Sequence, residues 1–186
     1  MRVISGTQKG RILKAVPGDR TRPTTDKVKE AVFNMIGPYF DGGTGLDLFA
    51  GSGGLGIEGL SRGLEKVVFV DRNYRAVQTV KSNLDICGFR EKAEVYKNDW
   101  KRALNAIIQR NLSFRVIWLD PPYNQDVYIN ILEKISEHGL LDPDGVVVCE
   151  HALEHKLPDT VQSLERKKPD RYGTVTISIY QHARRK

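Results

Sequence analysis

The tetrapeptide Asp120-Pro121-Pro122-Tyr123 offers the most specific chemistry in the sequence. It follows an apolar run, residues 114–119, that reads as a strand, and two consecutive prolines must end that strand because they cannot donate to a sheet. The stiff turn presents a carboxylate, backbone carbonyls without a competing N–H, and an aromatic ring. Such a set can hold a planar base by stacking and accept hydrogen bonds from its exocyclic amine. The tetrapeptide therefore predicts chemistry on a nucleobase amino group, although a rigid turn with a core tyrosine would read the same way.

A glycine-rich segment from Asp47 to Gly56 is the second candidate site. Its glycines Gly51, Gly53 and Gly56 satisfy the pattern G-x-G-x-x-G. Glycines permit a tight turn from strand to helix and let backbone N–H groups approach a ligand closely. The pattern alone fits a purely structural turn as well.

Two further acidic residues end apolar runs that read as strands. Asp71 stands 20 positions after Gly51, where a carboxylate can accept hydrogen bonds from ribose hydroxyls. Asp99 could accept from an adenine amine, with the ring of Trp100 beside the purine. Either aspartate could instead cap the helix that follows it. Carboxylates at the ends of three successive strands fit an adenosine ligand with a positive centre better than one with a pyrophosphate.

Alternating strands and helices are expected to position these residues. The strands are predicted at 45–49, 66–70, 93–97, 115–119 and 145–150, and the helices at 54–62, 74–87, 100–110 and 126–138. Repeated strand–helix units predict a parallel sheet with helices on both faces and ligands at the carboxyl ends of the strands. All the candidate residues fall at those ends. The tail differs, because 161–167 and 174–180 read as an antiparallel pair joined through 169–173.

The N-terminal 25 residues are expected to form a small extension of the main domain, residues 26–186. Residues 2–5 and 11–16 flank a turn with Gly6 and Gly10, which predicts a β-hairpin followed by a basic loop. A helix over 26–36 should then begin at a cap, Thr24 or Thr25, and end at Gly37-Pro38.

Composition narrows the class of protein. The chain has 186 residues and a net charge of +6, and its first 30 residues hold eight Lys and Arg against three Asp and Glu, which favours a polyanionic partner. Cys87 and Cys149 lack metal-ligand spacing and the four histidines form no metal set, so no metal is expected. No signal peptide or apolar run of membrane-spanning length is evident, so we expect a cytoplasmic protein that does not associate with a membrane.

These residues together resemble a known superfamily. The segment 47–56, Asp71, Asp99 and the Asp-Pro-Pro-Tyr turn, in this order, look like the motifs of class I S-adenosylmethionine-dependent methyltransferases, and Asp-Pro-Pro-Tyr is typical of those that methylate exocyclic amines of bases. The stretches 2–6, 10–11 and 22–34 resemble the start of the RsmD family, bacterial enzymes that act on guanine N2 of small-subunit (16S) ribosomal RNA. The resemblance covers essentially the whole chain. It implies an α/β, Rossmann-like fold with a seven-stranded, mostly parallel sheet whose last strand is antiparallel.

The resemblance also implies roles for individual residues, with S-adenosylmethionine as cofactor and ribosomal RNA, free or within an assembling small subunit, as partner. The catalytic turn would be Asp120, Pro121, Pro122 and Tyr123. The cofactor would be bound by Asp47, Phe49, Gly51, Gly53, Asp71, Arg72, Asp99, Trp100 and Asp120. Phosphate contacts to RNA are expected from Arg11, Arg20, Arg22 and Lys27. The oligomeric state is left open, with a monomer slightly favoured.

Three other functions are compatible with part of the sequence. A DNA methyltransferase acting on adenine N6 or cytosine N4 would use the same turn, but the chain has no length for a separate target-recognition domain. A nicotinamide-dependent oxidoreductase would explain the glycines but leaves Asp99 and the Asp-Pro-Pro-Tyr turn unexplained. A non-catalytic RNA-binding module with a cofactor fold would have no need of these intact motifs.

Overall fold

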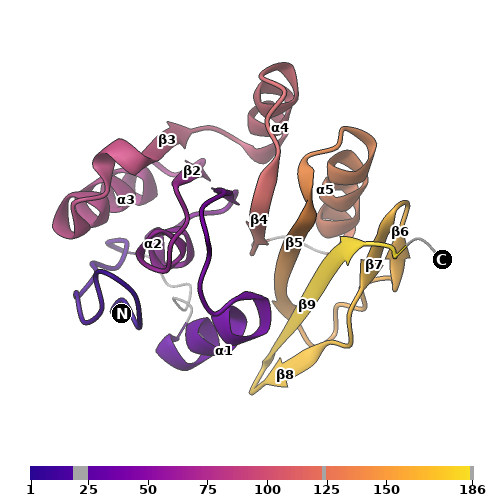
Figure 1. Ribbon diagram of the computed structural model, residues 1–186, viewed down its shortest axis with the longest axis horizontal. Helices are drawn as coiled ribbons and strands as arrows, with labels where there is room; N and C mark the ends of the chain where they lie inside the picture. Colours follow the sequence, from indigo (N-terminus) through magenta and orange to yellow (C-terminus); the bar gives the residue numbers. More distant parts are fainter. Residues whose placement is uncertain (19–24, 123–124, 185–186) are drawn as a thin grey trace.

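A single twisted sheet forms the centre of the protein in the computed structural model, which describes residues 1–18, 25–122 and 125–184 (Figure 1). The strands of these residues follow the order β3-β2-β1-β4-β5-β9-β7-β6, and β8 pairs with β9. Their bounds are β1 Thr44–Asp47, β2 Lys66–Asp71, β3 Ala93–Lys97, β4 Phe114–Leu119, β5 Leu141–Ala152, β6 Thr160–Val161, β7 Leu164–Arg166, β8 Asp170–Tyr172 and β9 Val175–His182. Strands β1 to β5 pair in parallel, whereas β9 runs antiparallel to β5 and to β7.

This architecture confirms the expected Rossmann-like fold. Seven of the strands, in the order β3-β2-β1-β4-β5-β9-β7, make the mostly parallel sheet with an antiparallel last strand. The prediction of seven strands was incomplete, because two short strands, β6 and β8, add to the sheet at β7 and β9. Strand β8 lies in the segment 169–173 that was expected to be only a connection.

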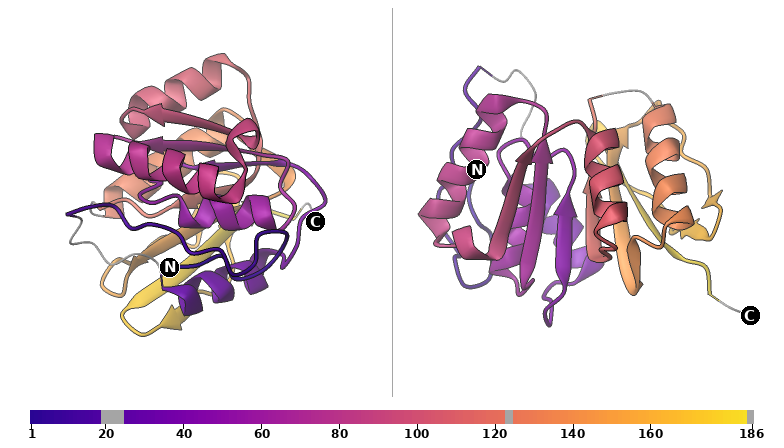
Figure 2. Two further views of the ribbon diagram at one scale, coloured as in Figure 1. Left: turned by 90° about the vertical axis from the view of Figure 1, so that its left-hand side faces the viewer. Right: turned by 90° about the horizontal axis from the view of Figure 1, so that it is seen from above.

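Helices cover both faces of the sheet. Their bounds are α1 Asp26–Ile36, α2 Gly54–Ser61, α3 Tyr74–Cys87, α4 Trp100–Gln109 and α5 Gln125–Glu137, with a short 3-10 turn at Arg90–Lys92. Buried residues of α4 and α5 pack into one hydrophobic cluster, and those of α1, α2 and α3 pack into another on the opposite face (Figures 1 and 2). No helix in the described part of the chain is long and apolar enough to cross a membrane.

Local signals explain where the helices begin and end. The side chain of Thr25 accepts a hydrogen bond from the Val28 N–H, which confirms it as the cap of α1. Asn73 accepts from Arg75 N–H and Ala76 N–H at the start of α3, and Gly88 ends that helix in the left-handed conformation, with φ 69°. Both helices therefore have the bounds that the sequence predicts.

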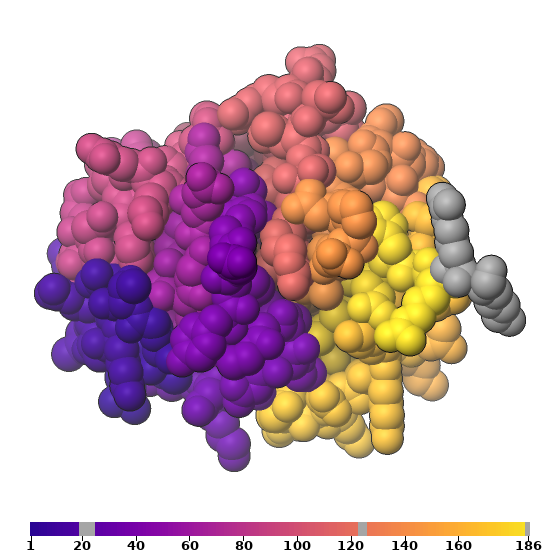
Figure 3. Space-filling model, in the orientation of Figure 1, coloured from indigo at the N-terminus to yellow at the C-terminus, as the bar shows by residue number. Residues whose placement is uncertain are grey.

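The N-terminal segment, residues 1–18, departs from the expected hairpin. Its two arms are joined by hydrogen bonds from the Val3 N–H to the Arg11 carbonyl and from the Leu13 N–H to the Met1 carbonyl. The pairing nevertheless amounts to one isolated bridge, Arg2–Ile12, rather than two strands. The reason is that this segment does not extend the sheet; it lies against helices, with Val3 and Leu13 buried among them. Figure 3 shows the segment, in indigo, against the surface formed by α2 and α3.

Buried polar side chains dock this segment on the helices. The carboxylate of Glu58 accepts from Ile4 N–H at 3.0 and 3.1 Å, and the Lys29 ammonium, fully buried, donates to the Arg2 carbonyl at 2.5 Å. Asn83, also fully buried, exchanges two hydrogen bonds with the Lys14 backbone and donates a third to the Ser52 carbonyl in the glycine-rich segment. The N-terminal segment is thereby tied to the loop that follows β1.

Candidate active site

The glycine loop between β1 and α2 is held open by Asp71 at the end of β2. Gly51 and Gly53 both take positive φ, 56° and 84°, a conformation that favours glycine. The Asp71 carboxylate accepts from Gly51 N–H at 2.9 Å and from Asn73 N–H at 2.9 Å. A Cβ added to Gly51 would meet no atom within 4 Å, so the loop faces open space there. Asp71 therefore fixes the loop while its side chain stays at the carboxyl edge of the sheet.

Asp47 lies beneath this loop. Its side chain is buried and accepts from the Gly56 N–H at 3.1 Å, in the first turn of α2. Burial raises the pKa of Asp47 to about 7, and the charge of Asp71 adds to this, while the hydrogen bond from Gly56 opposes it. Asp47 is thus a supporting carboxyl group whose charge changes near neutral pH.

The third acidic position, Asp99, serves as a helix cap. Its carboxylate accepts from Arg102 N–H at 3.0 Å at the start of α4 and pairs with the Arg102 side chain at 3.6 Å. Trp100 and Phe49 are both partly buried and pack against the same hydrophobic cluster. Asp99 itself is exposed, so capping and ligand contact are compatible at this position. Arg72, predicted for the cofactor site, is exposed on the turn after β2.

The register of β4 and β5 brings two carboxylates together. Leu119 at the end of β4 pairs with Cys149, so the residues that follow, Asp120 and Glu150, are neighbours on adjacent parallel chains, which lie about 4.8 Å apart. Asp120 is exposed towards a cavity, yet protein on its other sides removes much of its hydration. This desolvation, then the charges of Glu150 and Asp47, raise the pKa of Asp120.

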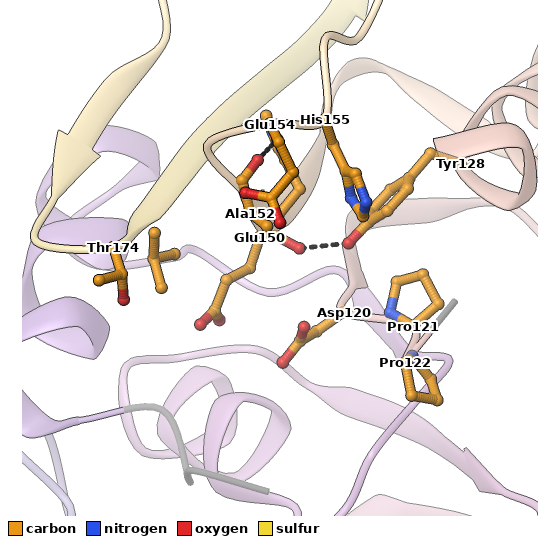
Figure 4. Close-up of a pocket in the computed structure, with 11 residues that line it drawn as sticks. Asp120, Pro121, Pro122, Tyr128, Glu150, Ala152, Glu154, His155 and Thr174 are labelled. Atoms are coloured by element: carbon orange, nitrogen blue, oxygen red, sulfur yellow. Dashed lines mark hydrogen bonds between the residues drawn. The ribbon is translucent and has the colours of Figure 1, made fainter. Parts of the chain in front are cut away.

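A cavity of about 490 Å³ opens beside this carboxylate pair (Figure 4). Its walls come from the Pro-Pro turn, α5, the end of β5 and the start of β9; the lining residues are Asp120, Pro121, Pro122, Tyr128, Glu150, His151, Ala152, Glu154, His155, Thr174 and Val175. Sites of roughly 300–1,000 Å³ suit small organic ligands. Figure 4 shows the carboxyl groups of Asp120 and Glu150 directed to the same side of the cavity. A nucleobase held there would have both carboxyl groups along its edge.

Aromatic and imidazole side chains form the opposite wall. The Tyr128 hydroxyl donates to the Glu150 carbonyl at 2.5 Å, and its ring meets the ring of His151 edge-on at 6.0 Å. His151 is buried and bonded to the Ser178 hydroxyl at 2.7 Å, and burial lowers its pKa, so it supports the wall as a neutral group. The Nδ1 atom of His155 is buried without a hydrogen-bond partner in the described structure. In that same part of the chain, no group of three or more metal-ligating side chains is assembled.

The structure brings some of the predicted site residues together and not others. Asp120, Pro121 and Pro122, predicted as part of the catalytic turn, line the cavity. Tyr123, Arg20 and Arg22 lie outside the described residues. Lys27 is exposed in the first turn of α1. Arg11 is exposed as well. Burial raises the pKa of Cys87, in the last turn of α3, and the charge of Arg11 opposes this, so Arg11 lies near that end of the helix, whereas Asp71 precedes the other end.

Sequence reasoning missed several residues that line the cavity, above all Glu150, Tyr128 and Thr174. Glu150 had a signal, since an acidic residue follows the apolar run 146–149 in the same way that Asp71 follows 67–70. Tyr128 and Thr174 had none, because their approach to Asp120 depends on how α5 and β9 pack.

The chain is similar to known proteins over nearly its whole length. The family described as "Conserved hypothetical protein 95" matches residues 1–181. The chain is 57% identical to "Putative rRNA methyltransferase YlbH" of Bacillus subtilis over 97% of its length and 98% of the relative's. It is 33% identical to "Ribosomal RNA small subunit methyltransferase D" of Haemophilus influenzae, covering 98% and 94% of the two chains. A solved structure, "Putative methyltransferase yhhF from Escherichia coli", superposes with a TM-score of 0.84 at 25% identity, covering 100% and 99%.

Proposed function

This chain belongs to the RsmD family of methyltransferases, and we propose that it transfers a methyl group from S-adenosylmethionine to the exocyclic N2 amine of a guanine in small-subunit ribosomal RNA. The observation that carries the proposal is the cavity beside Asp120, which is large enough for a base and lies, like the glycine loop, at the carboxyl edge of the sheet. The names of the relatives support ribosomal RNA as the substrate, and a cytoplasmic location would follow from that substrate.

The residues around the glycine loop fit S-adenosylmethionine. The open backbone at Gly51 would admit the ligand closely, and Asp71 would accept from its ribose hydroxyls. Phe49 and Trp100 belong to one cluster and would provide an apolar surface for the adenine, with Asp99 at its rim. The carboxylates of Asp47 and Asp71 at the loop suit a cation better than a pyrophosphate. When bound, the cofactor supplies a methyl group on a positively charged sulfur.

The work of the protein is then to orient the acceptor amine. The lone pair of an N2 amine is delocalised into the guanine ring, which makes the amine a weak nucleophile. Asp120 and the Pro121 carbonyl would accept hydrogen bonding from the amine and so direct its lone pair towards the methyl group. Tyr123 would stack on the base after it leaves its helix. Holding the reacting atoms in line can contribute about 7–11 kcal/mol to the rate.

The N-terminal 25 residues would contact the RNA backbone, while residues 26–186 carry the chemistry. Arg11, Arg20, Arg22 and Lys27 are our candidates for phosphate contacts. Arg11 lies far along α3 from the glycine loop, so a contact there would require an RNA surface that extends well beyond the target base. Such a surface would fit a folded RNA or an assembling ribosomal subunit better than a short strand.

The proposal is tested by methyl transfer from labelled S-adenosylmethionine to ribosomal RNA from cells that lack the gene, followed by mapping of the product by mass spectrometry. The wild-type protein should produce one N2-methylguanine, and Asp120→Ala should abolish transfer while calorimetry shows cofactor binding largely unchanged. Asp144→Ala is the matched control, because Asp144 is exposed near the other end of β5. Transfer to adenine or cytosine in DNA, or tight binding of NAD, would replace this proposal with one of the alternatives.

A further inference from the structure

We propose that Glu150 selects guanine, by accepting hydrogen bonds from N1–H and one N2–H along the edge of the base while Asp120 and Pro121 accept the other N2–H. This inference rests on the proposed function, because it assumes that the cavity holds the acceptor base. It assigns to β5 a role in specificity that is separate from the Asp-Pro-Pro-Tyr turn.

The position of Glu150 follows from strand register rather than from a flexible loop. It stands one residue beyond the Leu119–Cys149 pair, so it borders the cavity beside Asp120. On its other side the Glu150 backbone pairs with Ile177 of β9. The Tyr128 hydroxyl donates to the Glu150 carbonyl at 2.5 Å. The backbone of Glu150 is thus held from two sides, which fixes the point from which its side chain reaches the cavity. A group whose position is set before the ligand arrives can discriminate between ligands.

The chemistry of the bases makes a carboxylate at this place selective. Guanine presents two adjacent donors, N1–H and N2–H, that match the two oxygens of one carboxylate. Adenine and cytosine present a ring-nitrogen lone pair beside their amine, and that lone pair would face a carboxylate oxygen. A buried group left without its partner costs about 1–3 kcal/mol, which corresponds to roughly 5- to 150-fold in rate.

Glu154 is the other glutamate on the cavity wall and provides a comparison. Figure 4 shows it on the segment that follows β5, next to His155 rather than in the pair with Asp120. Desolvation, then the charges of Glu150 and Asp47, raise the pKa of Asp120. A substitution of Glu154 therefore changes the charge of the cavity wall alone, whereas a substitution of Glu150 also changes the group proposed to contact the edge of the base.

The test replaces the target guanine with 2-aminopurine in a synthetic RNA fragment. This analogue keeps the N2 amine but has a lone pair at N1, so it is a poor ligand for a carboxylate and an acceptable one for an amide. The wild-type protein should prefer guanine over 2-aminopurine by at least 10-fold in kcat/KM. Glu150→Gln should reduce that preference at least 10-fold, because the glutamine amide can donate to N1. Glu154→Gln should keep the wild-type preference, whatever its rate.

Two results would overturn the inference: a wild-type protein that does not discriminate between the two bases, or a Glu150→Gln protein that keeps the full preference while its activity falls. If ribosomal RNA is not methylated at all, the proposed function has failed, and a second measurement then tests the role of Glu150 separately. Guanosine and 2-aminopurine riboside are titrated into the protein with S-adenosylhomocysteine present, and binding is followed by NMR. Guanosine should bind more tightly to wild type, and equal binding of both nucleosides would refute the role of Glu150.

Discussion

Replacing Asn83 with alanine should both destabilise the protein and weaken cofactor binding. The Asn83 side chain is fully buried and makes hydrogen bonds of 2.8 and 3.0 Å with Lys14 and 2.9 Å with the Ser52 carbonyl. Each bond contributes about 1 kcal/mol net, so their loss should lower the free energy of unfolding by about 3 kcal/mol. For a chain of this length, that change corresponds to a fall in Tm of roughly 6–12 °C.

The same substitution frees the Ser52 carbonyl in the glycine loop. Because the loop would no longer be tied to α3, we expect the Kd for S-adenosylmethionine, measured by calorimetry below both melting temperatures, to rise several-fold. Ser82→Ala is the control, since it removes only the exposed 3.1 Å contact from Lys14 Nζ to the Ser82 hydroxyl. Its effect should stay within about 0.5 kcal/mol. An Asn83→Ala protein that melts within 1–2 °C of wild type (roughly the effect of a 0.5 kcal/mol change) would refute the energetic reasoning, and an unchanged Kd would refute the link to the loop.

Three further changes test the site. The pKa of Asp47 is raised from 3.8 to about 7, so the folded state binds the proton of this carboxyl group more tightly than the unfolded chain does. The free energy of unfolding should therefore fall as the pH rises from about 4 through 7. In thermal melts, Asp47→Asn should make Tm depend less on pH over this range. Asp71→Ala removes the acceptor for the Gly51 N–H and should raise the Kd for S-adenosylmethionine at least 10-fold by calorimetry; an unaltered Kd would contradict the bracing role. Tyr128→Phe removes the hydrogen bond to the Glu150 carbonyl and should lower kcat/KM about 10-fold while the cofactor Kd stays constant; equal loss of both would point to general unfolding.

Most of the fold could be predicted because local signals agree with it. Helix α3 has the predicted bounds, since Asn73 and Gly88 mark its two ends by capping and by a left-handed conformation. Strand β5 runs to Ala152, beyond the predicted end at Glu150, because β9 pairs with it past the end of β4. The N-terminal hairpin was wrong in its strands for a similar reason: burial against α1, α2 and α3, which the sequence pattern does not reveal, replaces extension of the sheet.

The candidate site also contains residues that the sequence could predict and residues that it could not. Asp120 and its two prolines could be predicted because their residue types already restrict the backbone and the hydrogen bonding. Glu150 was missed although it follows an apolar run as Asp71 does, because that signal is weak for a single glutamate and only the Leu119–Cys149 register places it beside Asp120. Asp99 shows the converse, since the sequence left cap and ligand equally open and the geometry shows that it caps α4.

The distribution of charge at the carboxyl edge constrains how RNA can reach the cavity. The chain carries a net charge of +6, yet carboxyl groups gather around the glycine loop and the cavity, among them those of Asp47, Asp71, Asp99, Asp120 and Glu150. Those that are ionised would favour a cationic methyl donor over its product, which has a neutral sulfur, and would oppose a phosphate at the same place. An RNA substrate would then place its backbone elsewhere, and Arg11 and Lys14, both exposed in the N-terminal segment, are available for that contact. On the proposed function, we therefore expect the base alone to enter the cavity, and salt to weaken RNA binding through the N-terminal segment without changing the preference for guanine.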